Sequence, residues 1–188
     1  PASHVATLPF TRMLAGPADY TPGVFCFDNP VQPNTRVHAT IANQLGLFVT
    51  MYSPLQMACD LPESYMKHPA EFQFIRDVPC DWQQSRLLSG EIGKYLVMAR
   101  QDRHSADWYI GAVNDDTPRD VTIDWSFLPD STYTVQIYRD APDADWQTNP
   151  YATVIETIRV ANTSEPLAIR LASGGGFAIR LTPVNDKQ

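Results

Sequence analysis

The side chains that could do nucleophilic or metal chemistry stand alone in this sequence. Its four histidines are His4, His38, His68 and His104, and neither a His-Glu-x-x-His spacing nor a paired-cysteine spacing occurs. Nucleophilic catalysis needs a Ser, Cys or Thr beside an oriented base, and no Gly-x-Ser-x-Gly turn is present. We therefore expect structural or solvent-exposed histidines, and the sequence predicts no catalytic, cofactor-binding or metal-ligating residue.

An acidic loop is the main alternative for a metal site. Asp140, Asp143 and Asp145 place three carboxylates in the seven residues that end at Trp146. Calcium takes oxygen ligands from such loops, but an EF-hand loop also requires Gly at its sixth position and Glu at its twelfth. Neither is present. We favour a solvated acidic turn between two strands, with a calcium site as the alternative.

The four tryptophans could instead stack on sugar rings. Trp108 and Trp125 fall inside expected strands and are interpreted as core residues, whereas Trp82 and Trp146 fall in expected loops. Because large aromatic side chains dominate cores and domain contacts, we favour packing for all four. Sugar stacking on Trp82 and Trp146 stays open.

The segment from Leu8 to Gly23 is the most distinctive part of the sequence. Its Gly16-Pro17 and Pro22-Gly23 steps predict a rigid corner, in which short polar side chains satisfy the backbone of the turn. We favour a structural corner across which Arg12 and Asp19 pair. The alternative is that this corner forms one wall of an active site.

The first half of the chain, which would have to position these residues, has a helical pattern. Between Thr35 and Lys67 apolar residues recur at intervals of three and four, and Asn34 or Thr35 can cap the helix start. Pro54 predicts a kink or restart. Further short helices are expected over Pro9–Ala15, after Asp60 and over Pro69–Asp77. The apolar stripe consists of Val37, Ile41, Leu45, Phe48, Val49 and Tyr52.

After Trp82 the period changes from 3.6 to 2. Short runs rich in β-branched and aromatic residues alternate with turn clusters, as in an antiparallel sandwich or barrel. The boundary is expected near residues 80–87. The eight predicted strands are Leu87–Leu88, Tyr95–Ala99, Trp108–Val113, Val121–Trp125, Tyr133–Tyr138, Thr153–Val160, Leu167–Leu171 and Phe177–Leu181.

Composition narrows the class of protein. A chain of 188 residues with 44% hydrophobic and 19% charged residues has the composition of a globular protein with a sizeable core. Its net charge of −7 gives no basic footprint for nucleic acid, and no apolar run is long enough for a membrane-spanning helix. We expect neither partner. Cys26, Cys59 and Cys80 cannot all pair, so we expect buried or half-buried free thiols.

Several segments together resemble glycoside hydrolase family 97, which includes α-glucosidases and α-galactosidases. The similarity covers nearly the entire chain. It is carried by Leu8–Gly23, Tyr52–Glu63, Phe74–Pro79, Asp107–Val113, Ile137–Asp140 and Gly174–Arg180.

The resemblance implies a mixed fold. Residues 1–83 would be the helical C-terminal remnant of a (β/α)8 catalytic barrel, and residues 84–188 an all-β antiparallel sandwich domain. The family's catalytic and calcium-binding carboxylates match no residue here and are expected upstream of Pro1.

The same resemblance implies a function for a longer parent protein. That parent would hydrolyse α-glucosidic or α-galactosidic bonds in oligosaccharides, with a calcium ion near the sugar, in the periplasm or outside the cell. We expect the fragment itself to be inactive, to bind no calcium and to self-associate through apolar surface on Phe10, Leu14, Phe48 and Tyr52. The alternative is a carbohydrate-binding or structural β-sandwich module without catalysis.

Overall fold

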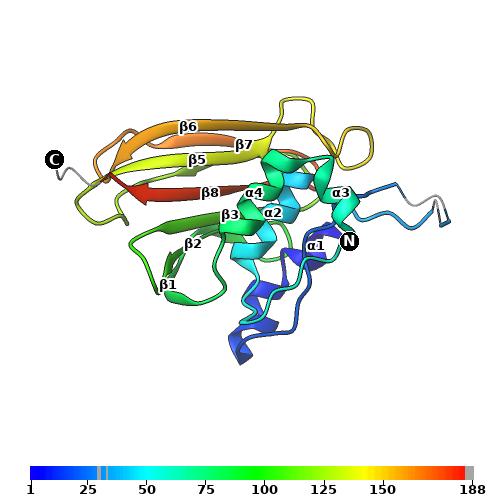
Figure 1. Ribbon diagram of the computed structural model, residues 1–188, viewed down its shortest axis with the longest axis horizontal. Helices are drawn as coiled ribbons and strands as arrows, with labels where there is room; N and C mark the ends of the chain where they lie inside the picture. Colours follow the sequence, from blue (N-terminus) through cyan, green and yellow to red (C-terminus); the bar gives the residue numbers. More distant parts are fainter. Residues whose placement is uncertain (29–30, 33, 185–188) are drawn as a thin grey trace.

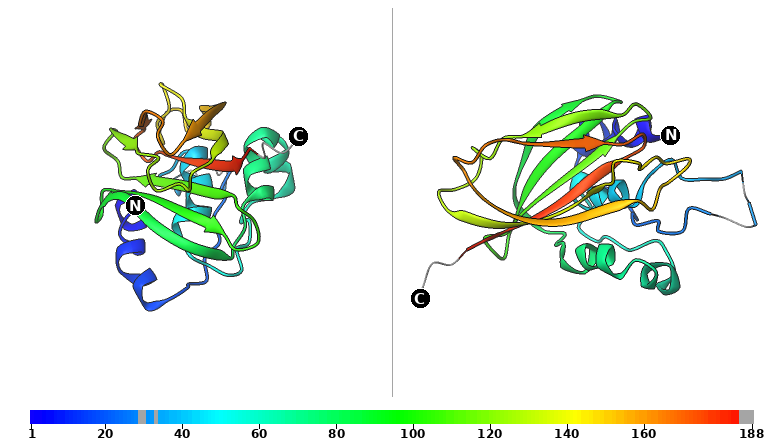
Figure 2. Two further views of the ribbon diagram at one scale, coloured as in Figure 1. Left: turned by 90° about the vertical axis from the view of Figure 1, so that its left-hand side faces the viewer. Right: turned by 90° about the horizontal axis from the view of Figure 1, so that it is seen from above.

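The computed structural model describes residues 1–28, 31–32 and 34–184, and its main feature is a two-sheet sandwich (Figures 1 and 2). All eight predicted strands are confirmed, and most are longer than the sequence patterns indicated. Their bounds are β1 Trp82–Glu91, β2 Tyr95–Asp102, β3 Trp108–Asn114, β4 Arg119–Ile123, β5 Thr132–Asp140, β6 Thr153–Ala161, β7 Leu167–Leu171 and β8 Gly176–Pro183.

The strands form a six-stranded sheet in the order β1-β2-β3-β8-β5-β6 and a two-stranded sheet of β4 and β7. Every neighbouring pair is antiparallel. The small sheet covers one face of the large one, and alternate residues of both fill the core between them. Trp108, Ile110, Ile123, Val135 and Leu171 are among its buried members.

The other face of the large sheet carries helix α2, Ile41–Thr50, which lies against β3 and β8 (Figure 1). All ten of its residues are buried. The helix approaches the sheet closely because glycines meet at the contact: a Cβ on Gly46 would lie 2.3 Å from the carbonyl oxygen of Ala112, and one on Gly111 would lie 2.5 Å from the carbonyl oxygen of Gly46.

Helix α2 starts later than the sequence pattern predicted. Thr40, with an extended backbone, is the N-cap, and its side chain accepts a hydrogen bond from the Asn43 N–H. The expected caps Asn34 and Thr35 were therefore wrong, and Val37 is 41% exposed rather than part of the buried stripe. The helix ends at Thr50, ahead of Pro54, so the proline lies in a loop and causes no kink.

The remaining helices are short. As expected, α3 spans Pro62–Met66 and α4 spans Pro69–Asp77, each with proline in its first turn. The expected helix over Pro9–Ala15 is instead two 3-10 turns, η1 Leu8–Phe10 and η2 Arg12–Ala15, preceded by α1 Ala2–Val5. None of the helices in the described ranges is both long and apolar enough to cross a membrane.

The helical part and the sheet share a core. Ile41, Leu45 and Phe48 of α2 pack in one apolar cluster with Tyr109 of β3 and Tyr138 of β5. In the described part before Trp82 there is no strand, and residues 16–28 run without a sheet ladder. The expected barrel remnant is thus seen only as helices and an extended segment that rest on the sandwich.

Candidate functional site

The N-terminus of α2 is fixed by a buried carboxylate from the end of β5. Asp140 is 3% exposed. One carboxylate oxygen accepts from the Thr40 hydroxyl at 2.7 Å, and the other accepts from the N–H groups of Ala172 and Gly176 at 2.9 and 2.8 Å. Burial raises the pKa of Asp140 to about 6, although these three hydrogen bonds oppose the shift. Helix, β5 and the β7–β8 connection therefore meet at one side chain.

The C-terminus of α2 is fixed by a buried cation from β2. Arg100 is 7% exposed and donates from Nε to the Val49 carbonyl at 2.6 Å and from Nη1 to the Ser85 hydroxyl at 2.5 Å. Its guanidinium lies 5.6 and 5.9 Å from the ring centroids of Tyr52 and Trp82. Burial lowers its pKa to about 10, so the group stays charged at neutral pH. A cation at a helix C-terminus interacts favourably with the helix dipole.

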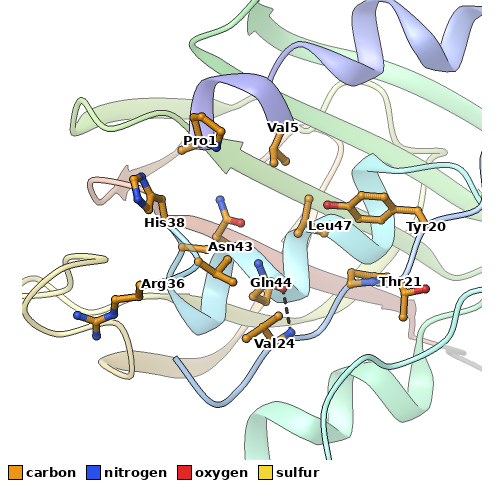
Figure 3. A pocket seen from close by; sticks show the side chains of 14 residues that line it. Pro1, Val5, Tyr20, Thr21, Val24, Arg36, His38, Asn43, Gln44 and Leu47 are labelled. Atoms are coloured by element: carbon orange, nitrogen blue, oxygen red, sulfur yellow. Dashed lines mark hydrogen bonds between the residues drawn. The ribbon is translucent and has the colours of Figure 1, made fainter. Parts of the chain in front are cut away.

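A pocket of about 470 Å³ opens along the side of α2 that carries Asn43, Gln44 and Leu47 (Figure 3). Three segments surround it: the N-terminal residues 1–5, the extended residues 20–24 and residues 36–39. Val5, Val24 and Leu47 give it apolar walls, and Asn43 and Gln44 of α2 lie between them. The distinctive corner of the sequence thus forms part of a pocket wall.

Helix α2 and a loop carboxylate hold the extended wall in place. The Oε1 atom of Gln44 accepts from the N–H groups of Gly23 and Val24 at 3.1 and 2.9 Å. Asp60 Oδ2 accepts from Phe25 and Cys26 at 2.7 and 2.6 Å. Burial works to raise the pKa of Asp60, but its hydrogen bonds outweigh burial and hold it below the ordinary value. Side chains rather than a sheet ladder satisfy this backbone.

The pocket contains polar groups but no acid–base pair. Its lining includes the hydroxyl of Tyr20, the amides of Asn43 and Gln44, the imidazole of His38 and the guanidinium of Arg36, and includes no Asp, Glu or Lys. General acid–base hydrolysis of a glycoside needs two carboxyl groups. This arrangement can therefore bind a ligand, but it offers no groups for hydrolysis.

The structure does not bring the four histidines together. His38 stacks on Trp146 with ring centroids 3.7 Å apart, and His68 stacks on Tyr151 at 5.3 Å. His4 and His104 are exposed, the latter 3.2 Å from Asp81. Among the described residues no group of three or more His, Cys, Asp or Glu side chains could hold a metal ion.

The acidic loop turns its carboxylates in different directions. Asp140 points into the core, while Asp145 accepts from the N–H groups of Gln147 and Thr148 and Asp143 accepts from Asn149. These carboxylates cap turns and do not converge, so their arrangement does not fit a calcium ion.

Trp82 is 6% exposed, so the packing role favoured for it is confirmed and it offers no face for sugar stacking. Other expectations about exposed residues were wrong: Phe48 is 3% exposed. Arg12 donates to the carbonyls of Gly16 and Pro17, and no described contact joins it to Asp19. Of the apolar residues expected at a self-association surface, Leu14 is exposed, whereas Phe10 and Tyr52 are half-buried.

The cysteines are free, as expected, but not as buried as expected. Cys26 and Cys59 are exposed and Cys80 is half-buried.

Sequence reasoning missed the residues that build the site. Asn43 and Gln44 lie outside the apolar stripe of α2 but are each 4% exposed, and Arg100 is a lone cation inside an apolar strand. A polar residue inside a run expected to be buried was the available signal, because such groups need a specific partner. Gly175 was grouped with a turn, but a Cβ there would lie 2.0 Å from the Asp140 carboxylate.

A sandwich packed on a buried helix, beside a pocket without catalytic carboxylates, defines the chain as a β-domain with an attached helical segment. The family model described as "Glycosyl-hydrolase 97 C-terminal, oligomerisation" matches residues 81–182, which is more than half of the chain and contains all eight strands except the last residue of β8. The chain belongs to glycoside hydrolase family 97.

Similar proteins are several times longer than this chain. A glycoside hydrolase family 97 enzyme from Pseudoalteromonas sp. strain K8, solved in complex with panose and with acarbose, is 45% identical with a TM-score of 0.92 over 98% of this chain and 29% of its own.

Two curated relatives are also several times longer than this chain. A retaining α-galactosidase from Bacteroides thetaiotaomicron is 34% identical over 93% of this chain, and a probable retaining α-galactosidase from Streptomyces bingchenggensis is 32% identical over 94%. The chain spans about a quarter of their length, 26% and 25% respectively.

Proposed function

We propose that these 188 residues are the C-terminal part of a longer glycoside hydrolase and that the hydrolytic carboxylates belong to the rest of that protein. The observation that carries the proposal is the match of 98% of the chain, with a TM-score of 0.92, to 29% of a family 97 enzyme. The absence of an acid–base pair from the lining of the large pocket agrees with it. In the longer protein this part supports the catalytic domain and supplies no reactive group.

We further propose that the longer protein acts on α-glucosidic bonds, with α-galactosidic bonds as the alternative. The relative at 45% identity was solved with panose, a trisaccharide of glucose, whereas the relatives named α-galactosidases are 34% and 32% identical. We expect the calcium ion that the resemblance implies to be held by residues outside this chain, and we expect export to the periplasm or secretion.

Hydrolysis assays test this proposal directly. Chromogenic α-glucosides and α-galactosides are offered to the longer gene product and to residues 1–188. We expect turnover of the glucoside by the longer protein and none by the 188-residue chain. Turnover by the short chain would contradict the assignment of the catalytic groups, and preference for the galactoside would reverse the assigned specificity.

Self-association is the second part of the proposed role. The description of the matching model, oligomerisation, supports a dimer or higher oligomer formed through the sandwich. The exposed apolar side chains of that region include Leu87 and Ile92, at 53% and 60% exposure, on and beside the edge strand β1. Light scattering of the 188-residue chain across a dilution series tests this, and a monomer at every concentration would refute it.

A further inference from the structure

We propose that two copies of this chain associate through strand β6, which pairs antiparallel with β6 of the second copy and joins the two large sheets into one. This inference rests on the self-association proposed above and adds the strand and the register. Its structural basis is the free edge of the large sheet, which β6 forms along the top of the molecule in Figure 1.

The backbone of β6 offers hydrogen-bonding groups on its free side. The Ala141 N–H donates to the Ala152 carbonyl at 3.0 Å, in the register of the β5–β6 ladder. Because bonded and non-bonded pairs alternate along an antiparallel ladder, even-numbered residues of β6 bond to β5 and odd-numbered residues present their N–H and C=O groups outward. Among the described residues, no hydrogen bond uses the outward backbone groups of Ile155, Thr157 or Arg159.

The strand is also regular and exposed. Its nine residues pair with β5 without a register shift. The side chains of Ile155, Thr157 and Arg159, whose backbone groups point outward, are exposed as well. A long and regular exposed edge is a template for pairing with another chain.

The other strand edges are less suited to pairing. Register shifts interrupt β1 on both sides of the segment Gln84–Leu87, and Arg86 lies within that segment. Bulges and charged side chains of this kind prevent edge-to-edge pairing. The strands of the small sheet, β4 and β7, have only five residues each. Of the strand edges in the described part of the chain, β6 is therefore the best suited to receive a second copy.

Symmetry selects the register of the pair. A two-fold axis normal to the sheet brings odd-numbered residues of one β6 opposite odd-numbered residues of the other, as the outward backbone groups require. With Thr157 on the axis, Ile155 lies opposite the partner's Arg159, and every residue of the strand is paired. An axis at Glu156 would place two carboxylates opposite each other. The register centred on Thr157 is therefore favoured.

Charges complement each other in this register. Glu71 of α4 accepts a hydrogen bond from the Thr153 hydroxyl at the start of β6. Arg159 lies diagonally across from the partner's Thr153, a separation that a long side chain spans, so its guanidinium meets the partner's Glu71. None of the described ion pairs includes Arg159, whereas Glu156, the other charge of the strand, is paired with Arg139 at 2.6 Å.

Sedimentation velocity over a dilution series tests this edge, in the longer gene product and in the 188-residue chain. Thr157→Lys changes an exposed side chain and leaves the ladder with β5 in place, but it puts two ammonium groups opposite each other on the axis. It should raise the dissociation constant of the dimer about tenfold or more, because like charges directly opposite each other destabilise a strand pair. Thr122→Lys is the matched control, since Thr122 is an exposed threonine of β4, and it should leave the dissociation constant unchanged.

An exchange of charges tests the register separately. Arg159→Glu should weaken the dimer, because it sets a carboxylate against the partner's Glu71. Combining Arg159→Glu with Glu71→Arg should restore most of the lost affinity. Urea unfolding of each variant establishes that a change in association does not come from a loss of folding.

Three outcomes would overturn the inference. If Thr157→Lys dimerises as tightly as the parent protein, in either the longer or the shorter form, β6 is not the interface and the proposed self-association stands without it. If the exchanged pair of charges is no tighter than Arg159→Glu alone, the register is wrong. If the parent protein is a monomer at every concentration, the self-association and this edge fail together.

Discussion

Replacing Asp140 by asparagine should make the chain more stable at neutral pH. The carboxylate is 3% exposed and its charged form has lost its hydration, which is why its pKa rises from 3.8 to about 6. Asparagine resembles the protonated acid: its oxygen can accept from Ala172 and Gly176, and its amide can donate to the Thr40 hydroxyl oxygen. The substitution therefore keeps the contacts and removes the buried charge.

The sign and size follow from linkage. A carboxyl with a raised pKa binds its proton more tightly in the folded state, so its stabilising contribution is complete below pH 3.8 and is lost as pH rises through about 6. One pKa unit corresponds to about 1.4 kcal/mol, which gives about 3 kcal/mol over this interval. The Asp140→Asn variant should match the parent chain near pH 4 and exceed it by up to about 3 kcal/mol at pH 7.

Urea unfolding followed by tryptophan fluorescence at pH 4, 5, 6 and 7 measures this difference. Asp140→Ala is the contrasting variant: it leaves the buried N–H groups of Ala172 and Gly176 unpaired and should be destabilised by about 4 kcal/mol near pH 4. If Asp140→Asn is less stable than the parent chain at pH 7, the hydrogen bonds outweigh burial. The charge would then stabilise the contact, and our account of this side chain would be wrong.

Two further substitutions test the same contact between helix and sheet, and a third tests the extended segment. Gly46→Ala should destabilise the chain by about 3 kcal/mol in urea unfolding. Its Cβ would lie 2.3 Å from the carbonyl oxygen of Ala112, so the helix would have to move away from the sheet. An unchanged free energy of unfolding would refute the close approach of helix and sheet. Arg100→Met should lower the free energy of unfolding by about 2 kcal/mol, because it leaves the Val49 carbonyl at the end of α2 without its donor. The loss should be equal at pH 5 and pH 8. A loss that depends on pH would contradict this account of Arg100. Asp60→Ala should lower the free energy of unfolding by about 2 kcal/mol at pH 7. Because the pKa of Asp60 is held below its ordinary value, this loss should shrink as pH falls below 3.8. A loss that grows in acid would contradict the direction of the pKa shift.

The strands were predictable because their signal is local. A run such as Trp108–Val113 carries no charged or amide side chain and is bounded by turn residues, and nothing distant has to be known to recognise it as a buried strand. Strand pairing was not predictable to the same degree. The two-stranded sheet of β4 and β7 joins residues such as Val121 and Ile169, which no short-range pattern relates.

The start of α2 depends on a distant residue. Val37 fits the helical period as well as Ile41, so the pattern alone extends the helix too far toward the N-terminus. Thr40 becomes the cap because its hydroxyl is bonded to Asp140, a residue 100 positions later. The same holds for Gly176, which looks like a turn residue in sequence but is needed where the Cα of Asn43 would lie 2.8 Å from an added Cβ.

The pocket was the least predictable part, since each of its walls comes from a different segment and its polar groups are buried. The apolar stripe of the helix does not include Asn43 and Gln44, yet each is 4% exposed, and Gln44 is bonded to the extended segment. The distinctive corner was recognised from its Gly-Pro and Pro-Gly steps, but the side chains it contributes to the pocket are those of Tyr20, Thr21 and Pro22, and not that of Asp19.

The position of α2 determines two features: its contact with the sheet, and the pocket beside it. The sheet supplies a carboxyl from β5 at the N-terminal end of α2 and a cation from β2 at its C-terminal end, so the position of the helix is set from both ends by the sandwich. Asn43 and Gln44 lie on that helix, and Gln44 in turn fixes the extended wall. A change at Asp140 or Arg100 that shifts α2 should therefore also displace Gln44 and the extended wall that it holds.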